Sequence, residues 1–229
     1  MKAKIIEIFS SIQGEGKYAG TRQVFVRFFE CNIHCHWCDT PHSIGDTTRN
    51  YREMTLAQVC QEIDKVRAGC QAVTLTGGEP LLQAEFIKAL LPQLKERGLS
   101  VHVDTNGILP EALSGLIGGI DCVAMDMKLP SSTKCAPYWE EHKEFLKIAT
   151  RRDVFVKAVI TSDTEGIDIE KAAAIVQEID PGVLFILQPN TFELGNGVVK
   201  RCQEFYDICS QRLENVRILP QMHKILKVR

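Results

Sequence analysis

No part of the 229-residue sequence contains the roughly 20 consecutive apolar residues that a membrane-spanning helix needs. Charged and polar residues interrupt the N-terminal segment within a few positions, so it does not resemble a secretory signal. We therefore expect a soluble, cytoplasmic protein with no membrane partner. The formal net charge is only −2, which gives no electrostatic reason to expect a nucleic acid as partner. A small polar ligand fits this charge balance better.

The sequence also lacks internal repeats and linker-like segments, so we expect a single domain over residues 1–229. Apolar, β-branched runs typical of strands alternate with segments of helical periodicity. The strand-like runs are 23–29, 72–76, 100–105, 121–127, 153–160 and 183–188. The helix-like segments are 55–68, 84–97, 110–117, 138–149, 168–179 and 198–213, followed by a short strand and tail over 215–229.

This alternation predicts an α/β fold with a parallel sheet, because parallel neighbours need a crossover that is usually a helix. Six such units are too few for a closed eight-stranded barrel. An open doubly wound sheet and a partial barrel both remain. In either case we expect the chemistry at the carboxyl ends of the strands.

Nine cysteines without a secretory signal argue against a disulfide framework, because the cytosol keeps thiols reduced. Three of them, Cys31, Cys35 and Cys38, are clustered in FECNIHCHWCDTPH (29–42), directly after a predicted strand. Thiolates on so short a loop can converge on one metal centre, and sulfur ligands favour zinc or an iron–sulfur cluster. The other six cysteines form no second close set, so we expect structural thiols and no auxiliary cluster.

The spacing of the three cysteines alone does not identify the metal that they would bind. Structural zinc needs four ligands, and one of three histidines on the same loop, His34, His36 or His42, could supply the fourth. Three thiolates can instead hold a 4Fe-4S cluster that keeps one iron open for a further ligand.

The cysteine loop, together with TLTGGEP (74–80) at the end of the next predicted strand, resembles the motifs of the radical S-adenosylmethionine (SAM) superfamily. The resemblance implies a partial (β/α)6-type TIM barrel, in some members with shortened helices. It also implies a 4Fe-4S cluster on Cys31, Cys35 and Cys38, with SAM on the open iron. Cleavage of SAM by one electron then yields a 5′-deoxyadenosyl radical that abstracts hydrogen from the substrate.

Three further segments, SIQGEG (11–16), LQPN (187–190) and ILPQMHKIL (218–226), resemble the 7-carboxy-7-deazaguanine synthase family. The likeness runs nearly end to end. Members contract the ring of 6-carboxy-5,6,7,8-tetrahydropterin, with loss of ammonia, in queuosine and other 7-deazapurine pathways. The resemblance further implies Mg2+, a homodimer, and an electron donor such as a flavodoxin or ferredoxin.

Site residues follow from the same resemblance. Glu15 would accept hydrogen bonds from the amino-pyrimidine edge, Arg27 would bind the substrate carboxylate, and Thr40 would help to hold Mg2+. The other expected substrate positions are Ile12, Gln13, Gly14, Thr76 and His223. The expected cofactor positions are Trp37, Cys38, Asp39, Gly78, Glu79, Asp126, Met127, Lys128, Gln188, Pro189, Asn190 and Thr191. No residue is expected to act as a protein acid or base.

Some of these residues have a structural alternative. Arg27 lies in VFVRFF, a run expected to be covered on both sides, where an internal ion pair is the alternative to a substrate carboxylate. QGEG is an ordinary surface turn if the resemblance is ignored, and a lone histidine such as His223 is more often structural. The chain departs from many relatives by having DMK (126–128) where they have SPK, and by continuing as ILKVR after HK.

Two other functions are compatible with parts of the pattern. An enzyme that abstracts hydrogen from a glycine of a partner protein would use the same cluster and cofactor, but it needs an open face. A non-enzymatic zinc or electron-transfer protein would not need TGGEP. The SIQGEG loop favours the pterin enzyme over both.

Overall fold

The computed structural model describes residues 1–45 and 50–228. Its nine strands are β1 Lys2–Ile12, β2 Arg22–Phe28, β3 Arg52–Thr55, β4 Ala72–Gly77, β5 Ser100–Thr105, β6 Cys122–Asp126, β7 Asp153–Ile160, β8 Leu184–Pro189 and β9 Val216–Ile218. The α-helices are α1 Leu56–Val66, α2 Ala84–Glu96, α3 Pro110–Ser114, α4 Pro130–Thr133, α5 Trp139–Ala149, α6 Gly166–Ile179, α7 Val198–Ser210 and α8 Met222–Leu226. Short 3-10 turns include η1 Gly16–Tyr18, η2 Pro41–Ser43, η4 Ile117–Gly119 and η5 Thr191–Glu193.

All nine strands form one sheet in the order β3-β1-β2-β4-β5-β6-β7-β8-β9. From β2 through β4 to β9 the strands are parallel and follow their order in the sequence. A doubly wound sheet would reverse this order at a switch point. Because no reversal occurs here, the sheet has the order of a partial barrel, and the predicted fold class is confirmed.

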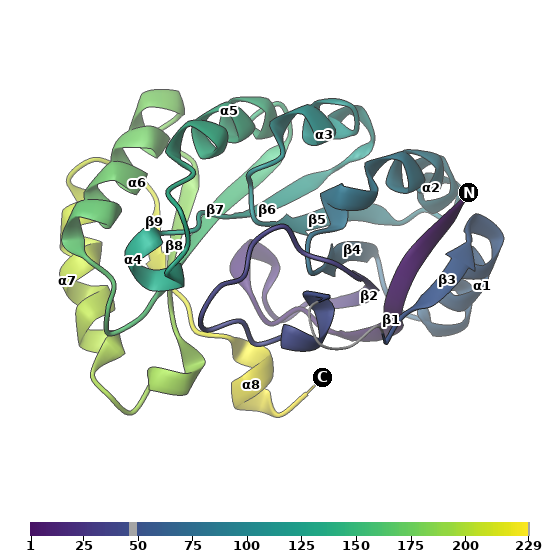
Figure 1. The fold of residues 1–229 in the computed structure, drawn as a ribbon, viewed down its shortest axis with the longest axis horizontal. Helices are drawn as coiled ribbons and strands as arrows, with labels where there is room; N and C mark the ends of the chain where they lie inside the picture. The colour runs from purple at the N-terminus through teal and green to yellow at the C-terminus, as the bar shows by residue number, and fades with distance from the viewer. Residues whose placement is uncertain (46–49, 229) are drawn as a thin grey trace.

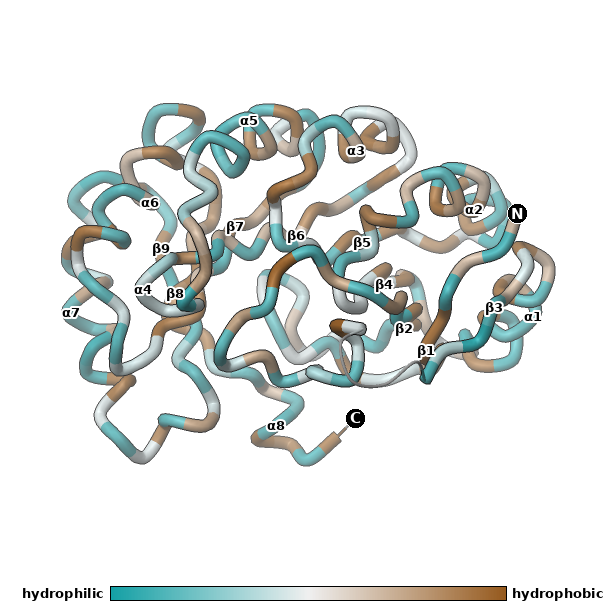
Figure 2. The backbone as a smooth tube through the Cα atoms, in the orientation of Figure 1, coloured by the Kyte–Doolittle hydropathy of each residue, from teal (hydrophilic) through white to brown (hydrophobic). Residues whose placement is uncertain are grey.

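The helices and the sheet form two layers around an inner space. Figure 1 shows α1, α2, α3, α5, α6 and α7 in an arc along the outer side of the strands, with the loop after β2 and α8 on the inner side. The outer helices alternate hydrophilic and hydrophobic segments along their turns (Figure 2). In the described parts of the chain, no helix combines the length and apolar character needed to cross a membrane.

The predicted strands correspond to β2 and β4 to β8, and each predicted helix agrees with an observed one within a few residues. Thr55 caps α1 through a capping box with Gln58. The sequence prediction missed β1 and β3, which pair antiparallel at the edge of the sheet. Their burial explains the miss, because only Met54 is buried in β3 and three of eleven residues are buried in β1. Helix α8 was also missed.

Strand β2 separates the core from the inner space. Val24, Val26 and Phe28 are fully buried in the core on one face of β2. Phe25 and Arg27, on the other face, line a cavity. The two-residue alternation of a strand therefore supplies the core and the site from one segment.

The GGE segment after β4 packs against the loop that carries the cysteines. A Cβ atom on Gly78 would lie 2.2 Å from the carbonyl oxygen of Glu30 and 2.8 Å from that of Ser43. The Glu79 N–H donates to the Glu30 carbonyl oxygen at 2.8 Å. Gly78 is an expected cofactor position, and glycine lets a ligand approach the backbone closely. The structure shows that it is needed first for close approach to the chain's own cysteine loop.

Alanine at Gly78 would press a methyl group against a backbone oxygen that cannot rotate away. We expect Gly78→Ala to lower the free energy of unfolding by about 1–3 kcal/mol in urea denaturation. Gly118→Ala is the matched control, because a Cβ atom there meets nothing within 4 Å, and its effect should stay below about 1 kcal/mol. Equal losses in both variants would contradict tight packing at Gly78.

Candidate active site

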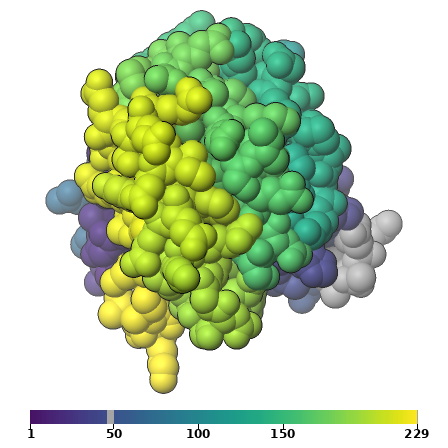
Figure 3. Space-filling view, turned by 90° about the vertical axis from the view of Figure 1, so that its left-hand side faces the viewer, coloured from purple at the N-terminus to yellow at the C-terminus, as the bar shows by residue number. Residues whose placement is uncertain are grey.

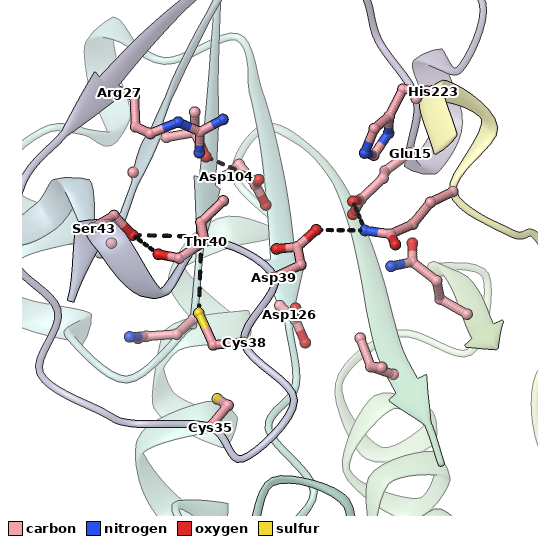
Figure 4. A pocket seen from close by; sticks show the side chains of 18 of the residues that line it. Glu15, Arg27, Cys35, Cys38, Asp39, Thr40, Ser43, Asp104, Asp126 and His223 are labelled. Atoms are coloured by element: carbon pink, nitrogen blue, oxygen red, sulfur yellow. Dashed lines mark hydrogen bonds between the residues drawn. The ribbon is translucent and has the colours of Figure 1, made fainter. Parts of the chain in front are cut away.

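A cavity of about 420 Å3 lies at the carboxyl ends of the parallel strands, bounded by the cysteine loop, the loop after β1 and α8 (Figure 4). Most residues expected from the sequence line it. They are Ile12, Gln13, Gly14, Glu15, Arg27, Cys31, Cys35, Trp37, Cys38, Asp39, Thr40, Thr76, Gly78, Asp126, Lys128, Gln188, Asn190, Thr191 and His223. Folding therefore joins motifs from both ends of the chain in one site.

Three expected cofactor positions, Glu79, Met127 and Pro189, do not line this cavity. Met127 is fully buried in the core, and its N–H donates to the Lys157 carbonyl oxygen. Pro189 is the last residue of β8 and pairs in register with Ile160. Both side chains are buried, and the contact of these two positions with the cofactor stays a prediction.

Glu79 has a structural role instead. Its buried carboxylate accepts hydrogen bonds from the backbone N–H groups of Leu81 and Asn106 and from the Thr105 hydroxyl, at 2.8–3.0 Å. Burial raises the pKa of Glu79 to about 7, although all three hydrogen bonds act in the opposite direction. The carboxylate thus ties the end of β4 to the end of β5.

The three clustered cysteines are partly buried and all face the cavity. Two hydrogen bonds hold their loop on the segment around α4, one from the His36 N–H to the Thr133 carbonyl oxygen and one from Trp37 Nε1 to Ser132 Oγ, both 2.9 Å. Burial raises the pKa of Cys35 to about 12, so a thiolate there requires a cationic partner.

Over residues 1–45 and 50–228, no three Cys, His, Asp or Glu side chains are grouped closely enough to hold a single metal ion. A 4Fe-4S cluster makes a different demand, because each cysteine binds a different iron and the thiols surround a larger body. Three thiols on one short loop, all facing the same cavity, fit that demand.

A buried charge network crosses the cavity wall. Lys157, in the middle of β7, is only 6% exposed, and its Nζ forms an ion pair with Glu15. The same Nζ lies 3.8 Å from Asp104 Oδ1 and 3.7 Å from Asp126 Oδ2. Asp126 is paired in turn with Lys128 Nζ at 2.7 Å. Each of the three carboxylates comes from a different element.

This network sets the charge states. Burial raises the pKa of Glu15, but the charge and hydrogen bond of Lys157 and the hydrogen bond from Gln221 outweigh it and bring the pKa to about 2. Burial also raises the pKa of Asp104, against the lowering effect of Lys157. Burial would lower the pKa of Lys157, yet the surrounding carboxylates raise it well above its ordinary value. Glu15 is therefore an acceptor only.

Two buried acceptors in the wall, Asp126 Oδ1 and Gln188 Oε1, have no hydrogen-bond partner within the described chain. Both residues line the cavity. Buried polar atoms are nearly always paired in native proteins, so these two point to a ligand with N–H or O–H donors. The amino and hydroxyl groups of SAM are such donors. Lys128 Nζ adds a positive charge 4.9 Å from the centre of the Trp37 ring.

The C-terminal segment closes one side of the cavity through Gln221. Its Nε2 donates to Glu15 Oε1 at 2.7 Å and to Asp39 Oδ2 at 3.1 Å. Its Oε1 accepts a hydrogen bond from the Thr191 hydroxyl at 2.5 Å. One amide side chain thus connects the SIQGEG loop, the cysteine loop and the loop after β8.

Helix α8 packs directly on the SIQGEG loop. The Met222 N–H donates to the Gly14 carbonyl oxygen at 2.8 Å. A Cβ atom on Gly14 would lie 2.0 Å from His223 Nδ1, so glycine is required there by the imidazole ring. Beyond α8 the end of the chain projects from the body of the molecule, at the bottom of Figure 3.

Arg27 lies on the side of the cavity away from Glu15 and His223 (Figure 4). Its Nε donates to Glu7 Oε1 at 2.8 Å, and both side chains are partly exposed. The internal ion pair that the sequence left as an alternative therefore exists. The two Nη atoms of Arg27 have no hydrogen-bond partner among the described residues. This edge of the guanidinium group is therefore available to bind an anion.

Sequence reasoning missed three residues of this site. Lys157 stands in VFVKAVI, an apolar strand pattern like that of Arg27, and the same argument about buried charge would have found it. Asp104 is the penultimate residue of β5, near the carboxyl end where the chemistry was expected. Gln221 belongs to the quoted PQMHK motif, but nothing local in the sequence indicates its three contacts.

The family model and the similar proteins of known name agree on one family. The model of the radical SAM superfamily matches residues 26–177. The chain is 36% identical to the 7-carboxy-7-deazaguanine synthase of Geobacter sulfurreducens, over 98% of this chain and 97% of the relative. It is 33% identical to the Archaeoglobus fulgidus protein of the same name, over 100% of each chain.

Among solved structures, the fold is similar to the crystal structure of QueE from Escherichia coli. The TM-score is 0.69 at 20% sequence identity, and the similarity covers 97% of this chain and 95% of the other. At that identity the likeness supports the fold.

Truncating Gln221 should loosen the C-terminal segment. We expect Gln221→Ala to speed amide hydrogen exchange at Met222 by about 10–100-fold, because hydrogen bonds to charged groups contribute about 1.5–3 kcal/mol. Gln203→Ala, at an exposed position of α7, is the matched control and should change nothing at α8. Unaltered exchange at Met222 in Gln221→Ala would show that Gln221 does not hold the segment.

Proposed function

Because the chain belongs to the 7-carboxy-7-deazaguanine synthase family of the radical SAM superfamily, we propose that it converts 6-carboxy-5,6,7,8-tetrahydropterin to 7-carboxy-7-deazaguanine and ammonia. It would thus act as a carbon–nitrogen lyase of 7-deazapurine biosynthesis. The observation that carries this proposal is one cavity with the cysteine loop on one wall and an ionised, acceptor-only Glu15 on another.

Enzymes of the radical SAM superfamily use a 4Fe-4S cluster and SAM. We assign the cluster to Cys31, Cys35 and Cys38. When bound, the cluster and SAM supply one-electron chemistry that removes a hydrogen atom from the substrate. The unpaired acceptors Asp126 Oδ1 and Gln188 Oε1 would receive hydrogen bonds from the cofactor. Asp126 would thereby replace a residue of the SPK segment found in many relatives.

The substrate has a flat pyrimidinone ring with hydrogen-bond donors along its amino edge, and its saturated second ring carries the carboxylate. Glu15, held between Lys157 and Gln221, would accept hydrogen bonds from that edge. Arg27, on the other side of the cavity, would bind the carboxylate through its free outer edge. The separation of the anionic and cationic groups gives the substrate a single orientation, which is the main contribution of the protein to radical chemistry.

The same features weigh against the two rival functions. An enzyme acting on a glycine of a partner protein has no need of a buried carboxylate on the SIQGEG loop. A zinc or electron-transfer protein has no need of unpaired acceptors beside the cysteine loop. Neither alternative function explains why the chain is similar to named synthases over its full length.

Finer assignments belong to the same proposal. The Thr40 hydroxyl lines the cavity 3.4 Å from Ser43 Oγ, and one or two hydroxyl groups suffice for Mg2+, which keeps several water ligands. We also propose that the chain acts as one catalytic unit over residues 1–229, as a homodimer, with a flavodoxin or ferredoxin as electron donor. The single sheet from β1 to β9 supports the catalytic unit.

The function is tested with anaerobically reconstituted protein. We expect about four irons per chain, reductive cleavage of SAM, and formation of 7-carboxy-7-deazaguanine from the carboxytetrahydropterin, measured with and without Mg2+. One zinc and no iron would refute the radical enzyme. SAM cleavage without turnover of this pterin would retain the superfamily and remove the specific function.

Substitution of Arg27 tests the carboxylate site. Arg27→Lys keeps the positive charge but loses the planar fork, so the KM for the pterin should rise about 10–100-fold. Iron content and the KM for SAM should not change. Arg22→Lys, at an exposed position of the same strand, is the control. An unchanged KM for the pterin would assign Arg27 to its ion pair with Glu7 alone.

A further inference from the structure

Lys157 is a buried ammonium group in the wall of the cavity, next to Glu15. Its Nζ forms an ion pair with Glu15 and lies within 4 Å of Asp104 and Asp126. An ammonium carries three N–H donors, and here three carboxylates surround it. Its strand is apolar on both sides of the charge, since Val156 and Ala158 are fully buried. Such a charge is retained only where its partners need it.

The charge count shows which partner depends on Lys157. Asp126 has a second cation, because Lys128 Nζ lies 2.7 Å from its Oδ2. In the part of the chain that the structure describes, Glu15 and Asp104 have no cation within ion-pair distance other than Lys157. Removing the ammonium would leave two partly buried carboxylates of like charge without a counter-charge. One of them would then take up a proton.

The other groups near Glu15 cannot replace the ammonium. Gln221 donates one hydrogen bond but carries no charge. His223 faces Glu15 from α8, and burial lowers its pKa, so it is mainly neutral near pH 7. Asp39 lies beyond Gln221 and is itself paired with Lys224 of α8, whose Nζ lies 3.7 Å from Asp39 Oδ2. The ionised state of Glu15 therefore depends on β7, a strand with no previously expected site residue.

We propose that Lys157 is a positioning residue for the reaction, holding Glu15 ionised and turned toward the amino-pyrimidine edge of the pterin. This inference rests on the proposed function and adds a determinant of substrate recognition. A neutral Glu15 would present an O–H donor to a row of substrate donors. The mismatch would weaken pterin binding more than SAM binding, because Asp126 keeps Lys128 as a second cation.

The test measures the KM for the pterin as a function of pH in reconstituted wild type and Lys157→Met. We expect the ratio of the two KM values to be about tenfold or more near pH 6 and to fall as the pH rises. The sign follows from Glu15. Burial raises its pKa, and without Lys157 the main opposing influence is lost, so alkaline pH restores the ionised acceptor. Lys157 also lowers the pKa of His223, so both KM profiles are measured again in a His223→Gln background, where that imidazole no longer titrates.

Two further variants separate positioning from folding. Lys157→Met/Asp104→Asn removes one repelling carboxylate, so the pH dependence should move to lower pH by about one unit. Lys157→Arg keeps a cation and should keep the pH dependence of wild type. If Lys157→Met does not fold, Lys157→Gln replaces it with the same expectation, because its amide is uncharged.

The outcomes distinguish this inference from the proposed function. A pH-independent KM defect, an unchanged KM, or a defect confined to SAM would overturn the role of Lys157 while the function stands. Wild-type protein that cleaves SAM but neither binds nor converts the pterin would overturn both. Iron content is measured in every variant, because loss of the cluster would assign Lys157 to the scaffold.

Discussion

A buried ammonium needs carboxylate partners, and the candidate active site is built around one such group. Lys157 on β7 is paired with Glu15 and lies close to Asp104 and Asp126. The partners come from the loop after β1, the end of β5 and the end of β6. Because an unpaired charge at such depth is costly, the pairing fixes how these segments meet. The contacts of Gln221 with Glu15 then build on a carboxylate already held in place.

The cysteine loop is positioned by a different set of forces. Gly78 and Glu79 dock it from the end of β4, and Trp37 anchors it to Ser132 beside α4. These contacts involve close backbone approach and neutral hydrogen bonds, with little dependence on buried charge. Gln221 connects the two halves through Asp39. Lys157 connects them a second time, because its Nζ lies 3.7 Å from Asp126 Oδ2.

Local pattern predicted much of this protein because strand and helix periodicity depend on neighbours in sequence. The parallel strands and the cysteine loop were both visible in the sequence. Strands β1 and β3 were not, since few of their residues are buried and the sheet edge supplies their partners. Arg27 was identified as a charge in an apolar strand, and Lys157 on β7 shows the same pattern.

By itself, the sequence determined the fold class, the family and the segments that carry the site, because these depend on motifs and periodicity within short stretches. Only the tertiary structure decided what each side chain contacts. It turned Glu79 away from the cavity, placed the His223 ring against Gly14 and joined Gln221 to Glu15. These contacts link residues far apart in the chain, so they depend on packing distances and buried charge in the folded protein, which no short stretch of sequence contains.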